Sequence, residues 1–330
     1  MLDYYRHAGL RAWVRGQLAE GMDAAFVYTA AMMPYVLHAP IPRVLDMVDV
    51  DSEKWAMYAR RERFPMRAVW AREARNLLAF ERRAAAASDV ALFVSSQEAA
   101  RFAELAPEAA SKIDFYENGV DLDALSPTRG WPDPFPGAGP HIVFVGHMDY
   151  WPNVDAVAWF AEVVMPLLAN LMPAPHFWIV GANPSEAVKR LSALPRVHVT
   201  GRVPEVEPYV AHADLSVAPL RMARGVQNKM LEAMAMGRPV IASPQAFEGV
   251  RAAPGVELLV ADGEEATARA VIAVLDGRHP TLGAAGRAAM ERAYAWPMTL
   301  ARLDAHLARC GVWATPAARP PHLRPATRPA

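Results

Sequence analysis

Short runs rich in β-branched and aromatic residues alternate along the chain with longer stretches of helical periodicity, a pattern typical of parallel α/β proteins. The first half holds four such runs, at residues 24–30, 43–49, 89–95 and 112–119. The second half holds six, at residues 141–146, 176–181, 197–201, 215–220, 239–243 and 256–261. Helical stretches are predicted between the last six, near residues 153–170, 184–193, 204–212, 228–236 and 264–276. Because these six runs are apolar throughout, we predict a sheet covered by helices on both faces.

A segment dense in proline and glycine, residues 126–140, separates the two halves. It cannot continue a helix or a central strand, so we interpret it as a linker between two Rossmann-like domains. The last part of the chain combines proline with alanine and arginine, which predicts a disordered tail. We predict a first domain at residues 1–126, a linker at 127–140 and a second domain at 141–296. A helix at residues 297–312 is predicted to pack back toward the first domain, and the tail follows at 313–330.

The first half has fewer predicted strands than the second and opens on a helix. Doubly wound domains normally begin with a strand and a glycine-rich turn that approaches a bound phosphate. A half-sheet would leave apolar edges uncovered, so we expect an N-terminal segment of the first domain to be missing and the chain to be impaired as an enzyme. The alternative interpretation is a genuinely smaller domain.

The composition narrows the class of protein. Lys and Arg number 34 and Asp and Glu 35, a net charge of -1, so no basic field for nucleic acid exists. A single cysteine, Cys310, excludes a disulfide framework and fits a reducing compartment. The longest charge-free run, residues 163–185, is interrupted by four prolines and is not a spanning helix. We expect a cytoplasmic protein, at most peripheral to the inner membrane.

The most informative stretch is residues 219–243, where a strand, a loop through Gly225, a helix and a second strand follow one another. Ligands of open parallel sheets sit beyond the carboxyl ends of the strands, and a glycine loop before a helix offers free amides to phosphate. Lys229, one of only four lysines, lies in the first turn of that helix, where the helix dipole disfavours a cation unless an anion is bound. With Arg224 beside it, we favour an anion site over two solvated side chains.

These segments resemble a known family. NGVD at 118–121, residues 197–220, LEAMAMGRPVIAS at 231–243 and the pair Tyr294 and Trp296 resemble the GT4 family of retaining GT-B glycosyltransferases. A tighter resemblance is to sugar transferases of exopolysaccharide loci and of the PEP-CTERM/exosortase system, carried by residues 48–55, 146–160 and 223–236. The resemblance covers roughly Tyr4 to Leu307. It implies a GT-B fold of two Rossmann-like domains and transfer of a sugar, with retention, from a nucleotide-sugar to a polysaccharide or lipid-linked glycan.

The resemblance also implies roles for single residues. Glu232 matches the carboxylate that binds the ribose hydroxyls, although a glutamate near a helix start is also favoured by the helix dipole alone. The two cations usual after the glycine of the first strand fall at His147 and Asn153, and the first donor-site glutamate falls at Arg224. Lys229 and Arg224 then supply the positive charge for a diphosphate. The donor-binding residues implied are Gly146, His147, Arg202, Val203, Arg224, Gly225, Val226, Gln227, Lys229 and Glu232.

On the acceptor side, the position of the family's His-Asp pair falls at Val48 and Asp49, which makes Asp49 the candidate for contacting the acceptor hydroxyl. Asp46 and Asp51 lie behind it, and we expect Asp51 or Ser52 to cap a helix. Residues 49–51 also match DxD, the metal–diphosphate motif of GT-A transferases, but so short a pattern arises often by chance. We expect no metal and no cofactor, because the nucleotide-sugar is a substrate.

Residues 54–83 combine nine basic residues with several aromatic ones. This composition suits either a solvated, arginine-rich helix pair or a peripheral contact with lipid headgroups.

Two alternatives to glycosyl transfer also stay open. One is a nucleotide-sugar epimerase of GT-B fold, which consumes donor without an acceptor, and the other is an inactive nucleotide-binding or scaffold protein.

Overall fold

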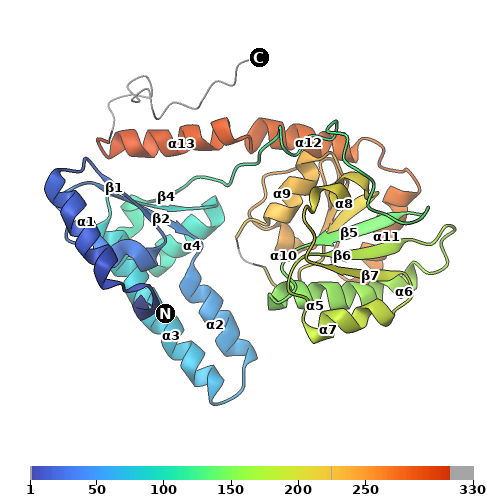
Figure 1. The fold of residues 1–330 in the computed structure, drawn as a ribbon, viewed down its shortest axis with the longest axis horizontal. Helices are drawn as coiled ribbons and strands as arrows, with labels where there is room; N and C mark the ends of the chain where they lie inside the picture. The colour runs from blue at the N-terminus through green and yellow to red at the C-terminus, as the bar shows by residue number, and fades with distance from the viewer. Residues whose placement is uncertain (1, 224, 313–330) are drawn as a thin grey trace. The chain divides into compact units, whose positions relative to one another are not determined.

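The computed structural model describes residues 2–223 and 225–312, which form two compact units (Figure 1). The first unit comprises Met1–Glu117 together with the chain from Thr299, and the second comprises Asn118–Met298. The segment predicted as a linker therefore belongs to the second unit. The reason is Phe135, which is buried in that unit's core and stacks on His141 with 4.0 Å between ring centroids. The tail predicted at 313–330 lies outside the described residues.

The first unit is built on a four-stranded parallel sheet whose strands follow one another in chain order. Each strand lies within one of the four predicted runs. The strands are β1 (Ala25–Tyr28), β2 (Arg43–Val48), β3 (Val90–Phe93) and β4 (Ile113–Phe115). The helices around them are η1 (Leu2–Tyr5), α1 (Ala8–Glu20), η2 (Ala30–Tyr35), α2 (Asp51–Arg61), α3 (Met66–Ala87), α4 (Ser96–Leu105) and η3 (Pro107–Lys112).

Alternate side chains of this sheet enter two different cores, as the two-residue period of a strand requires. Leu45 and Phe93 pack with Phe80 of α3 and Phe102 of α4 on one face. Val44, Val90 and Leu92 pack on the other face with Leu307, which belongs to α13 (Trp296–Arg309). The sheet is therefore closed on its second face by a helix from the C-terminal part of the chain. Arg309 of that helix also pairs with Asp114 of β4, which lies 195 residues earlier in the sequence.

The second unit contains a six-stranded parallel sheet in the order β10-β9-β8-β5-β6-β7. Every strand falls within one of the six predicted runs. The strands are β5 (His141–Val145), β6 (His176–Val180), β7 (Val197–Gly201), β8 (Leu215–Ala218), β9 (Val240–Ala242) and β10 (Leu259–Val260). The strand order reverses between β5 and β8, which is the switch point at which open α/β sheets bind ligands.

Helices cover both faces of this sheet, as predicted from its uniformly apolar strands (Figure 1). The helix predicted over 153–170 runs over residues 151–167 and contains a π-turn ahead of Pro166, which has no N–H to continue the helical ladder. The helices are α5 (Trp151–Trp159), η4 (Phe160–Val164), α6 (Met165–Leu167), α7 (Glu186–Arg190), η5 (Leu191–Ala193), α8 (Glu207–His212), α9 (Asn228–Ala235), α10 (Pro244–Phe247), α11 (Glu264–Leu275) and α12 (Leu282–Ala293).

Among the described residues, no helix is both long and apolar enough to cross a membrane.

Two helical glycines make a matched test of packing in the second unit. A Cβ on Gly283 of α12 would lie 2.1 Å from the backbone oxygen of Gly237, whereas a Cβ on Gly16 of α1 meets nothing within 4 Å. We expect Gly283→Ala to lower the free energy of unfolding by about 1–3 kcal/mol, because the backbone must move. The control Gly16→Ala should raise it by about 0.5–1 kcal/mol through helix propensity alone. Urea unfolding of both variants measures the difference, and equal effects would contradict the packing described for α12.

Candidate functional site

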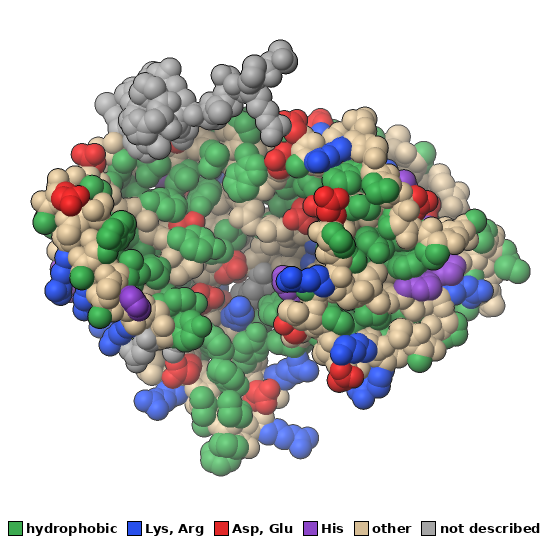
Figure 2. Space-filling view, viewed as in Figure 1, with side chains coloured by type: hydrophobic (Ala, Val, Ile, Leu, Met, Phe, Trp, Pro, Cys, Tyr) green, Lys and Arg blue, Asp and Glu red, His purple; other side chains and the backbone are tan. Residues whose placement is uncertain are grey.

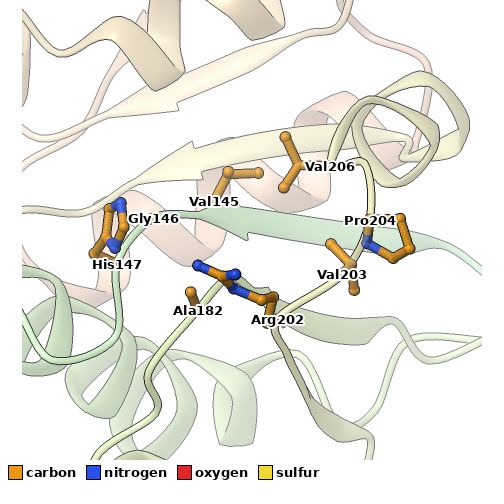
Figure 3. A pocket seen from close by; sticks show the side chains of 9 residues that line it. Val145, Gly146, His147, Ala182, Arg202, Val203, Pro204 and Val206 are labelled. Carbon is orange, nitrogen blue, oxygen red and sulfur yellow. The ribbon is translucent and has the colours of Figure 1, made fainter.

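The carboxyl ends of β5, β6 and β7 open on a pocket of about 680 Å³ in the second unit (Figure 3). Its walls come from the turns that directly follow these three strands. The lining residues are Val145, Gly146, His147, Gly181, Ala182, Arg202, Val203, Pro204 and Val206. Four of the predicted donor-binding residues, Gly146, His147, Arg202 and Val203, are thus brought together in one cavity.

The two ends of the pocket differ in chemistry. Val203, Pro204 and Val206 lie together at one end, while Gly146 and His147 lie at the other (Figure 3). The side chain of Arg202 lies between the two ends (Figure 3). A ligand with a flat apolar part joined to an anionic part matches this division, because Arg202 presents a permanent positive charge between an apolar wall and an open backbone turn.

Lys229 of α9 reaches the turn after β5. Its Nζ donates a 2.7 Å hydrogen bond to Oδ1 of Asn153 and lies 4.1 Å from the centroid of the Phe144 ring. A Cβ placed on Gly146 would lie 3.2 Å from the same Nζ. The lysine ammonium therefore lies beside Gly146, which lines the pocket, although Lys229 itself is not a lining residue and is far from Gly146 in the sequence.

Burial changes the charge of this lysine. Removal of the ammonium from water lowers the pKa of Lys229 to about 7, and the nearby carboxylate of Glu232 offsets only part of that effect. The hydrogen-bond partner of the ammonium is an amide oxygen, which cannot neutralise it. An anion entering beside Gly146 would supply the missing negative charge, so the arrangement favours anion binding.

Asn153 has a role that the sequence did not predict. Besides accepting from Lys229, it donates from Nδ2 to the backbone oxygen of His147 at 3.0 Å and so connects the lysine to the turn after β5. The turn itself requires two glycines. A Cβ on Gly146 would lie 2.7 Å from Nδ2 of Asn153, and one on Gly181 would lie 1.8 Å from the backbone oxygen of Gly146.

The loop before α9 supplies the other predicted residues. Gly225 has φ of +64°, a conformation that favours glycine, and its backbone oxygen accepts from Nε2 of Gln227 at 3.2 Å. Val226 packs against the core of the unit, and none of these three lines the pocket. Asn118 donates to Oδ1 of Asn228 at 2.9 Å, which ties the NGVD segment to the start of α9. Arg224 lies outside the described residues.

Glu232 lies one turn after Lys229 on α9. The first turn of this fully described helix contains no acidic residue, so the helix-dipole interpretation of Glu232 loses its basis. Burial raises the pKa of its carboxyl group, and the negative charge of Glu207 raises it further. Such a carboxylate gains from accepting hydrogen bonds, which hydroxyl donors of a ligand would provide.

Asp49, the predicted catalytic residue, lies in the first unit on the turn after β2. Burial, and then the charge of Glu98, raises the pKa of Asp49 to about 6. Its Oδ1 is buried and has no hydrogen-bond partner among the described residues. The preceding Val48 has φ of +67°, an uncommon conformation for a β-branched residue, and its amide donates to Asp46 at 3.1 Å.

The helix cap predicted after Asp49 is wrong. Neither Asp51 nor Ser52 caps α2, whose N-cap position is Val50 and carries no side-chain cap. Carboxylates from two other helices take the free amides instead. Glu98 of α4 accepts from the Val50 amide at 3.0 Å, and Glu81 of α3 accepts from the Ser52 amide at 3.1 Å. Among the described residues, no group of three or more His, Cys, Asp or Glu side chains is placed to hold a metal ion.

Comparison with protein-family models and solved structures indicates the class of enzyme to which this pocket corresponds. Residues 139–277 match the family model described as glycosyl transferases group 1. Among curated protein sequences, none matches the chain significantly. Sucrose-phosphate synthase from Thermosynechococcus elongatus has a similar solved structure, with TM-score 0.71 and 18% identity over 93% of this chain and 78% of that chain.

Two further structures are similar over nearly the same length. Anabaena Alr3699/HepE in complex with UDP has TM-score 0.67 and 14% identity over 90% of this chain and 82% of that chain. The UDP-forming trehalose-phosphate synthase from Burkholderia xenovorans has TM-score 0.68 and 12% identity over 92% of this chain and 78% of that chain. The predicted α/β fold with parallel sheets is confirmed, and it matches GT-B glycosyltransferase structures. With the family match to the second unit, these findings support a GT-B glycosyltransferase.

The buried ammonium should cost stability in the absence of a ligand. The folded-state pKa of Lys229 is about 7 and its ordinary value 10.5, so the unfolded chain binds more protons between these values. The penalty is therefore full below pH 7 and disappears as the pH rises toward 10.5. We expect Lys229→Met to be more stable than the unsubstituted protein by about 1–3 kcal/mol at pH 6, and by progressively less at pH 9.

Lys189→Met is the matched control, because the Lys189 side chain is 54% exposed and pairs with Glu186 in the same unit. Its free energy of unfolding should change by less than about 0.5 kcal/mol at either pH. Chemical unfolding at both pH values checks the prediction. A stability gap for Lys229→Met that grows with pH would contradict the electrostatic account.

Proposed function

We propose that this chain is a GT4-like retaining glycosyltransferase that moves a sugar from a nucleotide-sugar onto a polysaccharide or lipid-linked glycan in exopolysaccharide biosynthesis. The observation that carries the proposal is the Lys229 ammonium beside Gly146, at one end of a pocket whose other end is lined by Val203, Pro204 and Val206. The glycosyl transferases group 1 match over residues 139–277 supports the same conclusion for the unit that contains this pocket.

The two ends of the pocket suggest how a donor would lie. The base would pack on Val203 and Pro204, and the diphosphate would lie over the Gly146 turn beside Lys229, with Arg202 and His147 within its reach. The free amides of the loop at 225–227 would face the same diphosphate. Glu232 would accept hydrogen bonds from the ribose hydroxyls. Anabaena Alr3699/HepE was solved with UDP and with UDP-glucose, which makes these the first ligands to test here.

The reaction requires charge stabilisation more than a strong base. The acceptor oxygen forms a bond to the anomeric carbon as the bond from that carbon to the diphosphate oxygen breaks on the same face. The acceptor proton passes to the departing diphosphate, whose negative charge Lys229 and the loop amides stabilise. Asp49 is our candidate for accepting a hydrogen bond from the acceptor hydroxyl. Its pKa of about 6 leaves it ionised, and able to accept, at pH 7 and above.

Two substitutions separate the diphosphate from the ribose. We expect Lys229→Ala to weaken binding of both UDP and inorganic pyrophosphate by about 10- to 150-fold, the usual effect of losing one charge-assisted hydrogen bond. Glu232→Gln should weaken UDP binding but leave pyrophosphate binding nearly unchanged, because its proposed partner is the ribose. Calorimetric titration of each variant with each ligand is the measurement, with Lys189→Ala as the charge-matched control.

If neither substitution alters UDP affinity beyond the Lys189→Ala control, the segment from Gly225 to Glu232 is only a structural helix start. The proposed mechanism would then have no donor site. A loss of pyrophosphate binding in Glu232→Gln would instead move the diphosphate toward that carboxylate.

Turnover distinguishes transfer from the two alternative functions. With UDP-glucose as donor, we expect UDP release to depend on an added glycan acceptor and to survive excess EDTA, because Lys229 and backbone amides meet the diphosphate charge. Release without acceptor, accompanied by a changed sugar, would indicate an epimerase, and binding without release an inactive nucleotide-binding protein. Abolition by EDTA with rescue by manganese would move the metal–diphosphate role to Asp49 and Asp51.

A further inference from the structure

The hairpin formed by α2 and α3 in the first unit ends in an unusually exposed tip. Every residue from Arg60 to Val69 is exposed to solvent. Phe64 is 84% exposed, and Met66 and Val69 are 41% and 44% exposed. A phenylalanine in this position adds nothing to a core and leaves its apolar surface in water, which is unfavourable in the free protein.

The tip contrasts with the stem of the same hairpin. In the stem, the rings of Trp55 and Trp70 stack with 4.8 Å between centroids, and Tyr58 packs edge-on against Trp55 at 5.5 Å. These aromatic residues are used to hold the two helices together. The exposure of Phe64 and Met66 is therefore a property of the tip and not of a loosely packed hairpin.

The tip is also strongly basic. Between Arg60 and Arg67 the chain carries four arginines, Arg60, Arg61, Arg63 and Arg67, and one glutamate, Glu62, so its net charge is 4 - 1 = +3. The whole chain has a net charge of -1, so this segment departs from the average of the molecule. Figure 2 shows apolar side chains at the tip of the hairpin with Lys and Arg side chains around them.

The convex shape of the tip favours one kind of partner. A stable protein interface buries roughly 800 Å² on each side with matching shape, which a helical hairpin end does not offer. A lipid surface needs no matching shape. It rewards a few apolar side chains at the headgroup level, and its anionic headgroups attract arginines that surround them.

We propose that the tip of the α2–α3 hairpin, residues 60–69, docks this protein on the surface of an anionic lipid bilayer. Phe64 and Met66 enter the headgroup region, and the four arginines lie against lipid phosphates. The contact does not involve the pocket in the second unit, so it is tested independently of the proposed glycosyl transfer.

Flotation of the full chain with lipid vesicles tests the proposal without nucleotide. We expect binding to vesicles of phosphatidylcholine mixed with phosphatidylglycerol, weaker binding to phosphatidylcholine alone, and a decrease with added salt. Phe64→Ser should reduce the partition coefficient about tenfold or more, since a phenylalanine ring then stays in water. Replacing Arg61 and Arg63 by glutamine should reduce it about fivefold for each arginine.

The matched control is Met172→Ser, because Met172 is 94% exposed and lies in the second unit. It should leave the partition coefficient unchanged, and Phe64→Trp should retain binding because tryptophan also enters the headgroup region. Thermal melting of each variant checks that these exposed substitutions leave the fold intact.

Any one of the following four results would overturn the proposal. The first is failure of the unsubstituted protein to float with anionic vesicles at low salt. The second is equal binding by Phe64→Ser and Met172→Ser. The third is equal binding to vesicles with and without phosphatidylglycerol. The fourth is self-association in light scattering without lipid that Phe64→Ser abolishes, which would assign the tip to a contact between copies of this chain.

Discussion

The arrangement around the pocket depends on one electrostatic constraint, a lysine ammonium kept from bulk water with an amide oxygen as its partner. Asn153 fixes the position of Lys229, and Gly146 must lack a side chain for both to approach the turn. Gly181 must lack one as well, because the adjacent turn packs on the Gly146 backbone. Burial of the Lys229 ammonium costs stability in the free protein, which is the usual sign of a site organised for a ligand and not for the fold.

The first unit also contains buried ionisable groups, but these are carboxylates and not an ammonium. Burial raises the pKa of Glu81 to about 7, just as it raises that of Asp49. Glu81 and Glu98 nevertheless hold the first amides of α2, so two carboxylates fix the turn on which a third is presented. Crowded carboxylates near one turn repel one another, so this turn is held in its orientation at a cost in stability.

The sequence predicted the strands well because a buried parallel strand is a local run of apolar residues, visible without knowledge of its neighbours. It could not predict the Lys229–Asn153 bond, which joins residues 76 positions apart, nor the burial of Phe135 within a segment whose prolines indicate a linker. The capping of α2 failed for the same reason, since its partners come from α3 and α4. Features set by the residues of a single helix or strand were predictable from the sequence. Features set by the packing of one element against another were not.

The path of the chain has a consequence for biosynthesis. The second unit is one continuous segment, whereas the first is interrupted by it and resumes at Thr299. Val44, Val90 and Leu92 are covered only when Leu307 has been translated. On the ribosome, the earlier-made sheet must therefore wait with one apolar face uncovered while the whole second unit emerges and folds. During that interval the nascent chain is a natural client for a chaperone that binds apolar surfaces. Once α13 packs on the sheet, this apolar face is covered.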